Sequence, residues 1–82
     1  MKEKVIFVKK FIFDGYNSFL EIIEKEWPLG GKDYYYYKYD ENHTFGDDVP
    51  YQYNKVYSRS YADVGEVVAE GYKQIDVFSR FL

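Results

Sequence analysis

The sequence predicts a small α+β domain with the element order β-α-β-β-α-β, which is the ferredoxin-like order. Three observations predict it. Three segments are rich in β-branched and aromatic residues, two segments repeat apolar residues at helical spacing, and 82 residues suit a single domain, 1–82. The expected architecture is an antiparallel sheet with two helices on one face. The alternative is the order β-α-β-β-α with a long C-terminal helix.

The first two elements are a strand and a helix. Residues 4–13 read KVIFVKKFIF and carry apolar side chains on both strand faces, which predicts a central strand, with Lys9-Lys10 marking a bulge or an exposed end. Apolar residues then recur along one helix face: Tyr16, Phe19, Leu20, Ile23 and Trp27. Ser18 and Glu21 have capping-box spacing, and Pro28 ends the helix.

The middle of the chain predicts a hairpin of two aromatic strands. The strands are residues 33–39 and 50–59, and the non-periodic segment 40–49 is a loop. Nine of the eleven tyrosines lie between Tyr34 and Tyr61. Because successive strand side chains point to opposite faces, these rings line both faces of the sheet, and a chain of this length cannot bury both.

The C-terminal part predicts a helix and a last strand. Ser60 is the expected cap, with Asp63 three residues later. The apolar stripe follows: Tyr61, Val64, Val67, Val68 and Tyr72. Gly71 is interpreted as a helix stop. Residues 74–82 fit both a strand and a helix, and the strand is favoured because the segment is short and β-rich.

Composition and charge exclude several function classes. Fourteen acidic and eleven basic residues give a net charge of −3, which disfavours direct binding to nucleic-acid phosphates. The absence of cysteine excludes disulfides and thiolate metal sites. No signal peptide or membrane-length apolar stretch is found, so a cytoplasmic protein without membrane association is expected. The frequent residue types have AT-rich codons, which favours a low-GC bacterium or its phage.

No catalytic motif is found, and neither a catalytic residue nor a cofactor is expected. His43 is the single histidine, and the chain has no triad pattern or phosphate-binding glycine loop. The best metal candidate is the acidic loop around it: Asp40, Glu41, Asp47 and Asp48. Its spacing does not match an EF-hand, because glycine and the last ligand position are out of place. We therefore expect a solvated acidic loop without metal.

The tyrosines predict a non-enzymatic protein-binding module, because tyrosine is enriched at interfaces. The expected contact residues are Tyr35, Tyr37, Tyr39, Tyr51, Tyr53 and Tyr57, with Asp40, Glu41, Asp47 and Asp48 as an acidic rim. A further acidic stripe on the last helix comprises Asp63, Glu66 and Glu70. Rows of carboxylates can replace a line of phosphates, so the expected partner is a protein with a basic surface. The concrete form is a phage or mobile-element inhibitor, of anti-CRISPR or anti-restriction type, that blocks a basic groove.

Binding of single-stranded nucleic acid is the alternative function. The run Ile6-Phe7-Val8-Lys9-Lys10-Phe11 resembles the first-strand motif of RNA-recognition-motif domains. The resemblance implies a base-stacking role for Phe7, and Tyr51 and Tyr53 would act with it. The third-strand motif of that family needs a basic residue and two small residues, which residues 50–57 lack. A tyrosine face or an open sheet edge also allows a homodimer.

Overall fold

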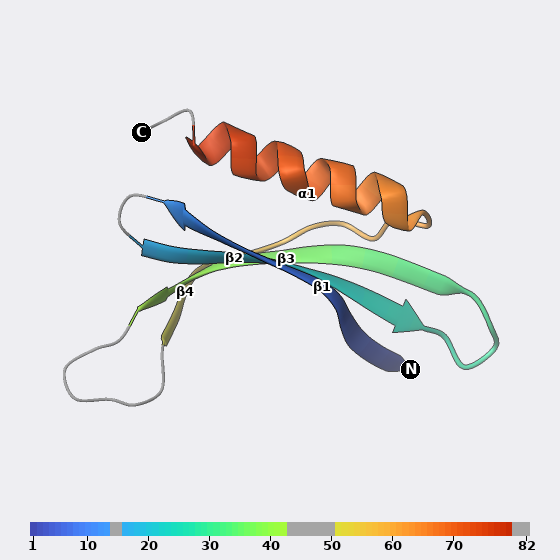
Figure 1. Cartoon of the computed structure of the whole chain (residues 1–82). Coiled ribbons are helices and arrows are strands. Elements are labelled where there is room, and N and C mark those ends of the chain that lie inside the picture. The colour runs from blue at the N-terminus through green and yellow to red at the C-terminus, as the bar shows by residue number, and fades with distance from the viewer. Residues whose placement is uncertain (14–15, 43–50, 80–82) are drawn as a thin grey trace.

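The computed structural model describes residues 1–13, 16–42 and 51–79. The elements are β1 (Lys2–Phe13), β2 (Tyr16–Glu26), β3 (Lys32–Asn42), β4 (Tyr51–Tyr57) and α1 (Val64–Ser79). The four strands form one antiparallel sheet in the order β1-β2-β3-β4, and α1 lies across one face of it (Figure 1). The described part of the chain is thus a meander of strands followed by a helix.

The predicted order β-α-β-β-α-β is wrong at its second and last elements. Residues 16–26 form a strand where a helix was predicted, and α1 continues to Ser79 where the last strand was predicted. One helix therefore covers the sheet in the described residues, where two were predicted. The C-terminal helix of the alternative order is present, but its first helix is not. The three strands predicted at 4–13, 33–39 and 50–59 are present as β1, β3 and β4.

β2 is extended because it has a strand partner on each side. β1 pairs with it from Tyr16 to Glu26, and β3 pairs with nearly the same stretch. Ile22 and Ile23 are β-branched, which favours an extended backbone over a helix. Ser18, the predicted helix cap, instead lies on the sheet, where its side chain reaches β3.

The pairing register assigns the side chains of the central strands to two faces, because directly opposite residues share a face. The face toward α1, called the helix face, carries Ser18, Leu20, Ile22, Glu24, Tyr34, Tyr36, Lys38 and Asp40. The other face, called the open face because no described element covers it, carries Phe19, Glu21, Ile23, Lys25, Asp33, Tyr35, Tyr37, Tyr39 and Glu41.

A bulge in β1 changes the face of its side chains. Ile6 is an extra residue between Val5, which pairs with Ile23, and Phe7, which pairs with Ile22. Val5 therefore lies on the open face and Phe7 on the helix face, although simple alternation places them together. The bulge predicted at Lys9-Lys10 lies here instead.

A second bulge divides the tyrosines of β4. Tyr57 pairs with Tyr37 on the open face, whereas Tyr53 pairs with Asp40 on the helix face. β4 has one more residue than β3 between these pairs, and Asn54 within this stretch has a φ of 52°. Asparagine tolerates this left-handed conformation better than most residues, which fits its position in the bulge.

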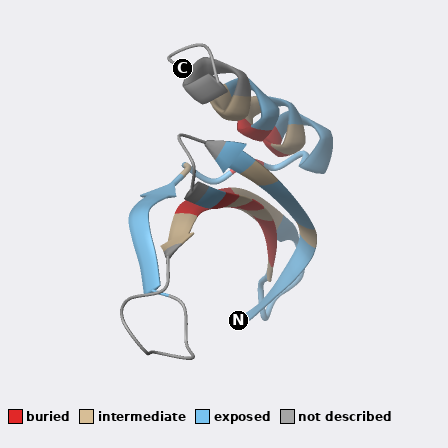
Figure 2. Cartoon of the chain, turned by 60° about the vertical axis from the view of Figure 1, so that its left-hand side comes forward, coloured by how far each residue is buried: buried red, intermediate tan, exposed pale blue. Residues whose placement is uncertain are grey.

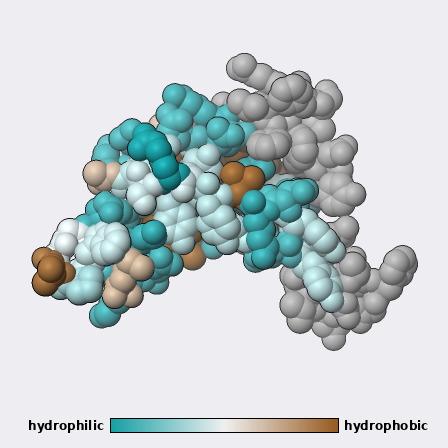
Figure 3. Space-filling model, turned by 180° about the vertical axis from the view of Figure 1, so that it is seen from behind, coloured by the Kyte–Doolittle hydropathy of each residue, from teal (hydrophilic) through white to brown (hydrophobic). Residues whose placement is uncertain are grey.

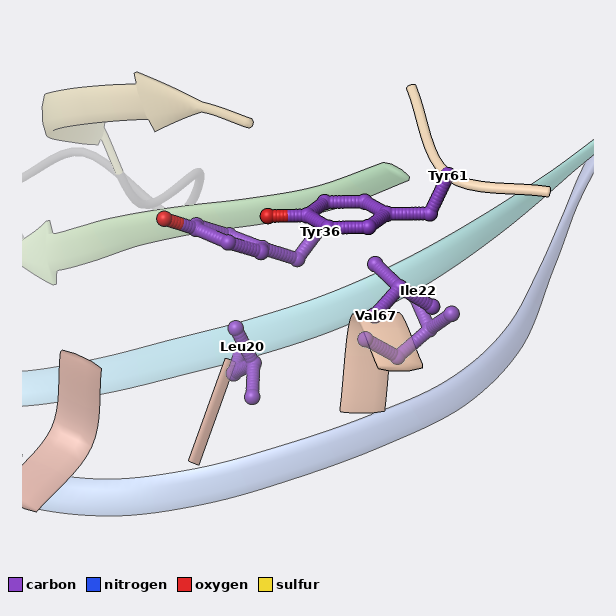
Figure 4. Close-up of a cluster of buried hydrophobic side chains, with 5 residues drawn as sticks. All are labelled: Leu20, Ile22, Tyr36, Tyr61 and Val67. Carbon is purple, nitrogen blue, oxygen red and sulfur yellow. The ribbon is translucent and has the colours of Figure 1, made fainter. Parts of the chain in front are cut away.

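The hydrophobic core lies between α1 and the central strands (Figure 4). It consists of Leu20, Ile22, Tyr36, Tyr61 and Val67. Figure 2 shows that buried residues lie mainly in β2, β3 and α1, and that the sheet is arched, with mostly exposed residues along its edge strands β1 and β4. α1 approaches the sheet closely at Gly71, where an added Cβ would lie 2.9 Å from Cδ2 of Leu20. The glycine predicted to stop the helix is therefore a packing position inside it.

The helix begins at Val64, so the prediction that Ser60 caps it is wrong. Asp63 occupies the capping position, and its carbonyl accepts a hydrogen bond from Val67 N at 3.3 Å. Residues 80–82, which belonged to the predicted last strand, lie outside the described residues. No helix in the described part of the chain has the length and apolar character needed to cross a membrane.

The segment before α1 is hydrogen-bonded to the first part of β3, which β4 does not reach. Tyr61 and Tyr34 exchange backbone hydrogen bonds of 2.8 and 2.7 Å. Ser58 N donates to the carbonyl of Tyr36 at 3.0 Å, and Ser58 Oγ accepts from Tyr36 N at 2.8 Å. These bonds fix the path by which the chain leaves β4 and crosses to the helix face.

Candidate functional site: the open face of the sheet

A row of stacked aromatic rings crosses the open face. The row consists of Phe19, Tyr39, Tyr37 and Tyr57, and we call it the aromatic row. Successive ring centroids lie 5.3, 4.8 and 4.6 Å apart, with interplanar angles of 15°, 30° and 14°. β2, β3 and β4 each supply members because Phe19 pairs with Tyr39 and Tyr37 pairs with Tyr57. The strand register thus builds the row.

The rings of the row bury one another unequally. Tyr39, between two other rings, is 6% exposed although no described element covers this face. Tyr37 is half-buried, and Tyr57, at the end of the row on the edge strand, is 61% exposed. Figure 3, which views the molecule from behind, shows pale side chains of intermediate hydropathy among hydrophilic ones, with small hydrophobic patches. The row therefore has a packed interior and one accessible end.

Polar groups surround the rings. The Tyr37 hydroxyl donates to Oε1 of Gln52 at 2.7 Å, and the Tyr35 hydroxyl donates to Oε2 of Glu3 at 3.4 Å. Nζ of Lys25 lies 4.9 Å from the Tyr35 ring centroid, which is within the range of a cation–π contact. A tyrosine ring on this face thus already accepts a cation from the chain itself.

Glu21 lies at the centre of the open face. It pairs with Val8 of β1 and Tyr37 of β3, and it is half-buried. Burial raises the pKa of the Tyr39 hydroxyl, and a hydrogen bond to Glu21 and the charge of that carboxylate raise it further. Burial, contact with the Tyr57 hydroxyl and the charge of Glu21 raise the pKa of Tyr37 to about 12. Burial is thus the main cause of both raised pKa values, and the charge of Glu21 adds to it.

Stability is expected to fall as the pH rises from 10 toward 12. The ordinary tyrosine pKa of 10.0 applies to the unfolded chain, whereas Tyr37 titrates near 12 in the fold, so the folded state holds more protons in this window. The stabilisation is complete below the lower value and is lost as the pH approaches the upper one. Tyr37 contributes up to about 2 kcal/mol after allowance for solvent screening.

Urea unfolding at a series of pH values measures this effect. Tyr37→Phe should flatten the alkaline decline, because the ring stays and the titrating hydroxyl goes. A Tyr37→Phe variant whose stability declines above pH 10 as steeply as that of the wild type would contradict the role of this hydroxyl.

No family model, curated protein or solved structure matches this chain. Functional inference therefore depends on the chemistry of the open face. Among residues 1–13, 16–42 and 51–79, no group of three or more metal-binding side chains comes together. His43, Asp47 and Asp48, which belonged to the candidate metal loop, lie outside the described residues.

The structure divides the predicted binding residues between the two faces. The open face holds Tyr35, Tyr37, Tyr39, Tyr57 and Glu41. The helix face holds Tyr51, Tyr53 and Asp40, with the two tyrosines exposed near the start of β4. Four of the six predicted tyrosines are therefore brought together, and the bulge in β4 separates the other two.

Asp40 has internal partners in place of the predicted position on an acidic rim. Its Oδ1 accepts from Ser18 Oγ at 2.6 Å, and its Oδ2 accepts from Asn54 Nδ2 at 3.0 Å. Lys38 lies nearby on the same face. Burial lowers the pKa of Lys38, and the charge of Asp40 acts in the opposite direction. These contacts place Asp40 in a polar cluster that joins β2, β3 and β4.

The predicted acidic stripe on α1 is partly neutralised by the chain. Glu66 pairs with Arg59 at 3.5 Å, and Glu70 pairs with Lys73 at 3.1 Å. Asp63 directly precedes the helix, and its hydrogen bond to Val67 N uses the backbone carbonyl, so this contact does not offset the charge of its carboxylate. The stripe therefore offers a partner less uncompensated negative charge than the sequence implied.

Phe7 does not join the open face. It packs against the core, with its ring centroid 6.2 Å from that of Tyr72. Tyr51 and Tyr53, the other rings of the nucleic-acid alternative, lie on the same helix face beyond the core. These three rings therefore do not form a base-stacking platform on the uncovered side of the sheet.

Sequence reasoning missed three residues of the open face. Phe19, Glu21 and Lys25 were assigned to a helix, yet all three lie on the strand face beside the tyrosines. If residues 17–25 are treated as a strand, the alternation of side chains between its two faces places these three residues on the same face. Glu21 then falls directly opposite Tyr37.

Proposed function

We propose that this protein is a non-enzymatic protein-binding module that acts in the cytoplasm and contacts its partner through the open face of the sheet. Its concrete form is a phage or mobile-element inhibitor, of anti-CRISPR or anti-restriction type, that blocks a basic groove of its target. The observation that carries the proposal is the aromatic row, which ends in an exposed ring with no described element over it.

Apolar side chains extend this surface across β1. Val5, Val8 and Ile12 lie on the open face by register and are exposed. Exposed apolar groups that gather on one face are typical of interaction sites. Tyrosine adds contact area at low entropic cost, since it has few rotatable bonds. The open face therefore combines apolar area with the aromatic groups that dominate binding energy at interfaces.

Charge on the open face favours a basic partner. Its acidic residues in the described strands are Glu3, Glu21, Asp33 and Glu41, and its basic residues assigned by register are Lys10 and Lys25. Such an excess of carboxylates attracts a basic surface and raises the association rate. Added salt should weaken this association because it screens the exposed charges.

Affinity capture from a low-GC bacterial lysate, followed by mass spectrometry, identifies the partner for the decisive titration. Tyr57→Ala is expected to weaken binding to the captured protein about tenfold or more, as for an aromatic hot spot. Val64→Ala removes an exposed apolar side chain from α1 and is the control. Unchanged affinity for Tyr57→Ala, together with loss for Val64→Ala, would place the contact on the helix and contradict the proposal.

A further inference from the structure

Glu21 has no cationic partner within the described part of the chain. The ion pairs there involve Glu24, Glu66 and Glu70. The contrast with Glu24 is clear, because that residue lies on the opposite face of the same strand and contacts Lys4 at 3.7 Å and Lys32 at 3.4 Å. A half-buried carboxylate gains most from a cation, since partial desolvation strengthens the attraction.

The surroundings of Glu21 suit a planar cation. Tyr37 and Tyr39 flank it, and the Tyr39 hydroxyl hydrogen-bonds to it. The rings of Tyr35 and Tyr57 lie 6.3 Å apart beside Tyr37, so π-faces and a carboxylate occupy the same part of the sheet. A guanidinium group can stack on an aromatic ring while its N–H groups bind a carboxylate, whereas an ammonium ion cannot stack.

We infer that the open face binds an arginine-bearing segment of a basic protein, with the guanidinium group contacting Glu21 and the neighbouring tyrosine rings. This inference rests on the proposed function and specifies the chemistry of the partner. A shallow hollow of about 220 Å³ lies next along the strands, lined by Glu3, Lys4, Val5, Ile23 and Tyr35; the last two are two residues from Glu21 and Tyr37 on the same face.

Lys25 competes with an incoming arginine, because its ammonium group already contacts a tyrosine ring of the open face. Its Nζ lies 4.9 Å from the Tyr35 ring centroid, and it faces Glu3 across the strand pair. An incoming arginine meets this positive charge on the open face. Removing Lys25 therefore frees a ring face and removes a repulsion, so the affinity for an arginine peptide should increase.

A hexa-arginine peptide is the probe, titrated into the full chain and followed by backbone amide shifts, with hexalysine and hexaglutamate in parallel. Glu21→Gln should weaken hexa-arginine binding about fivefold, as for loss of a charge-assisted contact. The variant keeps a side-chain oxygen that can accept from the Tyr39 hydroxyl, so it changes the charge with little change in shape. Lys25→Ala should tighten binding about threefold. Glu66→Gln, which changes the net charge equally on α1, should stay within about twofold of the wild type.

Three results of the peptide titrations would overturn the inference. Equal weakening by Glu21→Gln and Glu66→Gln would show attraction by net charge alone. Amide shifts confined to α1 would place the site elsewhere, and equal affinities for hexa-arginine and hexalysine would remove the role of stacking.

If Glu21→Gln binds the captured partner as the wild type does while Tyr57→Ala loses it, the open face is a protein-binding surface without the arginine contact. Retention by both variants would instead contradict the proposed function.

Discussion

Replacing Leu20 with alanine is expected to lower the free energy of unfolding by about 3–4 kcal/mol, within the range for buried leucines. Leu20 is fully buried in the core between β2 and α1. A domain of 82 residues has a total stability of roughly 4–12 kcal/mol, so this single change removes much of it. Urea unfolding followed by circular dichroism measures the loss.

Leu29→Ala is the matched control, since it deletes the same atoms from a fully exposed side chain in the β2–β3 turn. Its effect should lie within about 0.5 kcal/mol of zero. A similar loss for both variants would mean that α1 does not pack on Leu20 in solution.

Gly71 gives an independent test of this contact. Gly71→Ala places a Cβ near Cδ2 of Leu20, so it should destabilise the wild type even though alanine favours a helix by about 1 kcal/mol. In the Leu20→Ala background the clash is absent, and the same change should stabilise the protein. This reversal of sign is the signature of direct contact, and additive effects would contradict it.

The sequence located three of the four strands and the C-terminal helix, but it did not predict β2. Residues 16–26 satisfy both periodicities, because Phe19, Leu20 and Ile23 lie on one helix stripe and Leu20 and Ile22 lie on one strand face. Only pairing with β1 and β3 along the whole segment decides between them, and such long-range pairing leaves no local signal. The apparent capping box at Ser18 was coincidental, because its hydroxyl bonds across the sheet.

The C-terminal segment was assigned wrongly because a glycine has more than one role. Gly71 was interpreted as a helix stop, yet it lies within α1 and allows close approach to Leu20. Sequence spacing cannot distinguish these roles, since both favour a residue without Cβ. The helical spacing of Ile75 with later apolar residues indicated the helix that is present, and Ile75 packs against the core.

The sequence indicated only part of the candidate site, because strand alternation holds in β3 but not in β4. Alternation along β3 puts Tyr35, Tyr37 and Tyr39 on one face, because this strand is regular there. It failed in β4, where one extra residue moves Tyr53 away from Tyr57. A bulge follows from how two strands fit together, so the sequence of either strand alone does not specify it.

Replacing Asp40 with alanine is expected to destabilise the protein by about 2–3 kcal/mol, because the change removes the acceptor of the buried Ser18 hydroxyl and a charge beside a buried lysine. Ser18, which is fully buried, loses the acceptor at 2.6 Å, and Asn54 loses the one at 3.0 Å. Lys38, also buried, loses the nearby negative charge that offsets its desolvation. Urea unfolding at neutral pH measures the total loss in the free energy of unfolding.

Two further variants separate hydrogen bonding from charge. Asp40→Asn keeps an acceptor for Ser18 but removes the charge, so it should lose about half as much stability as Asp40→Ala. Asp33→Ala removes a half-buried carboxylate that accepts an exposed hydrogen bond from Trp27 Nε1 at 2.8 Å, and the loss of stability should stay below about 1 kcal/mol. If Asp40→Ala instead unfolds like the wild type and weakens partner binding, Asp40 belongs to the interface predicted from the sequence. The internal contacts favour the structural role, because a carboxylate already joining three strands has little capacity left for a partner.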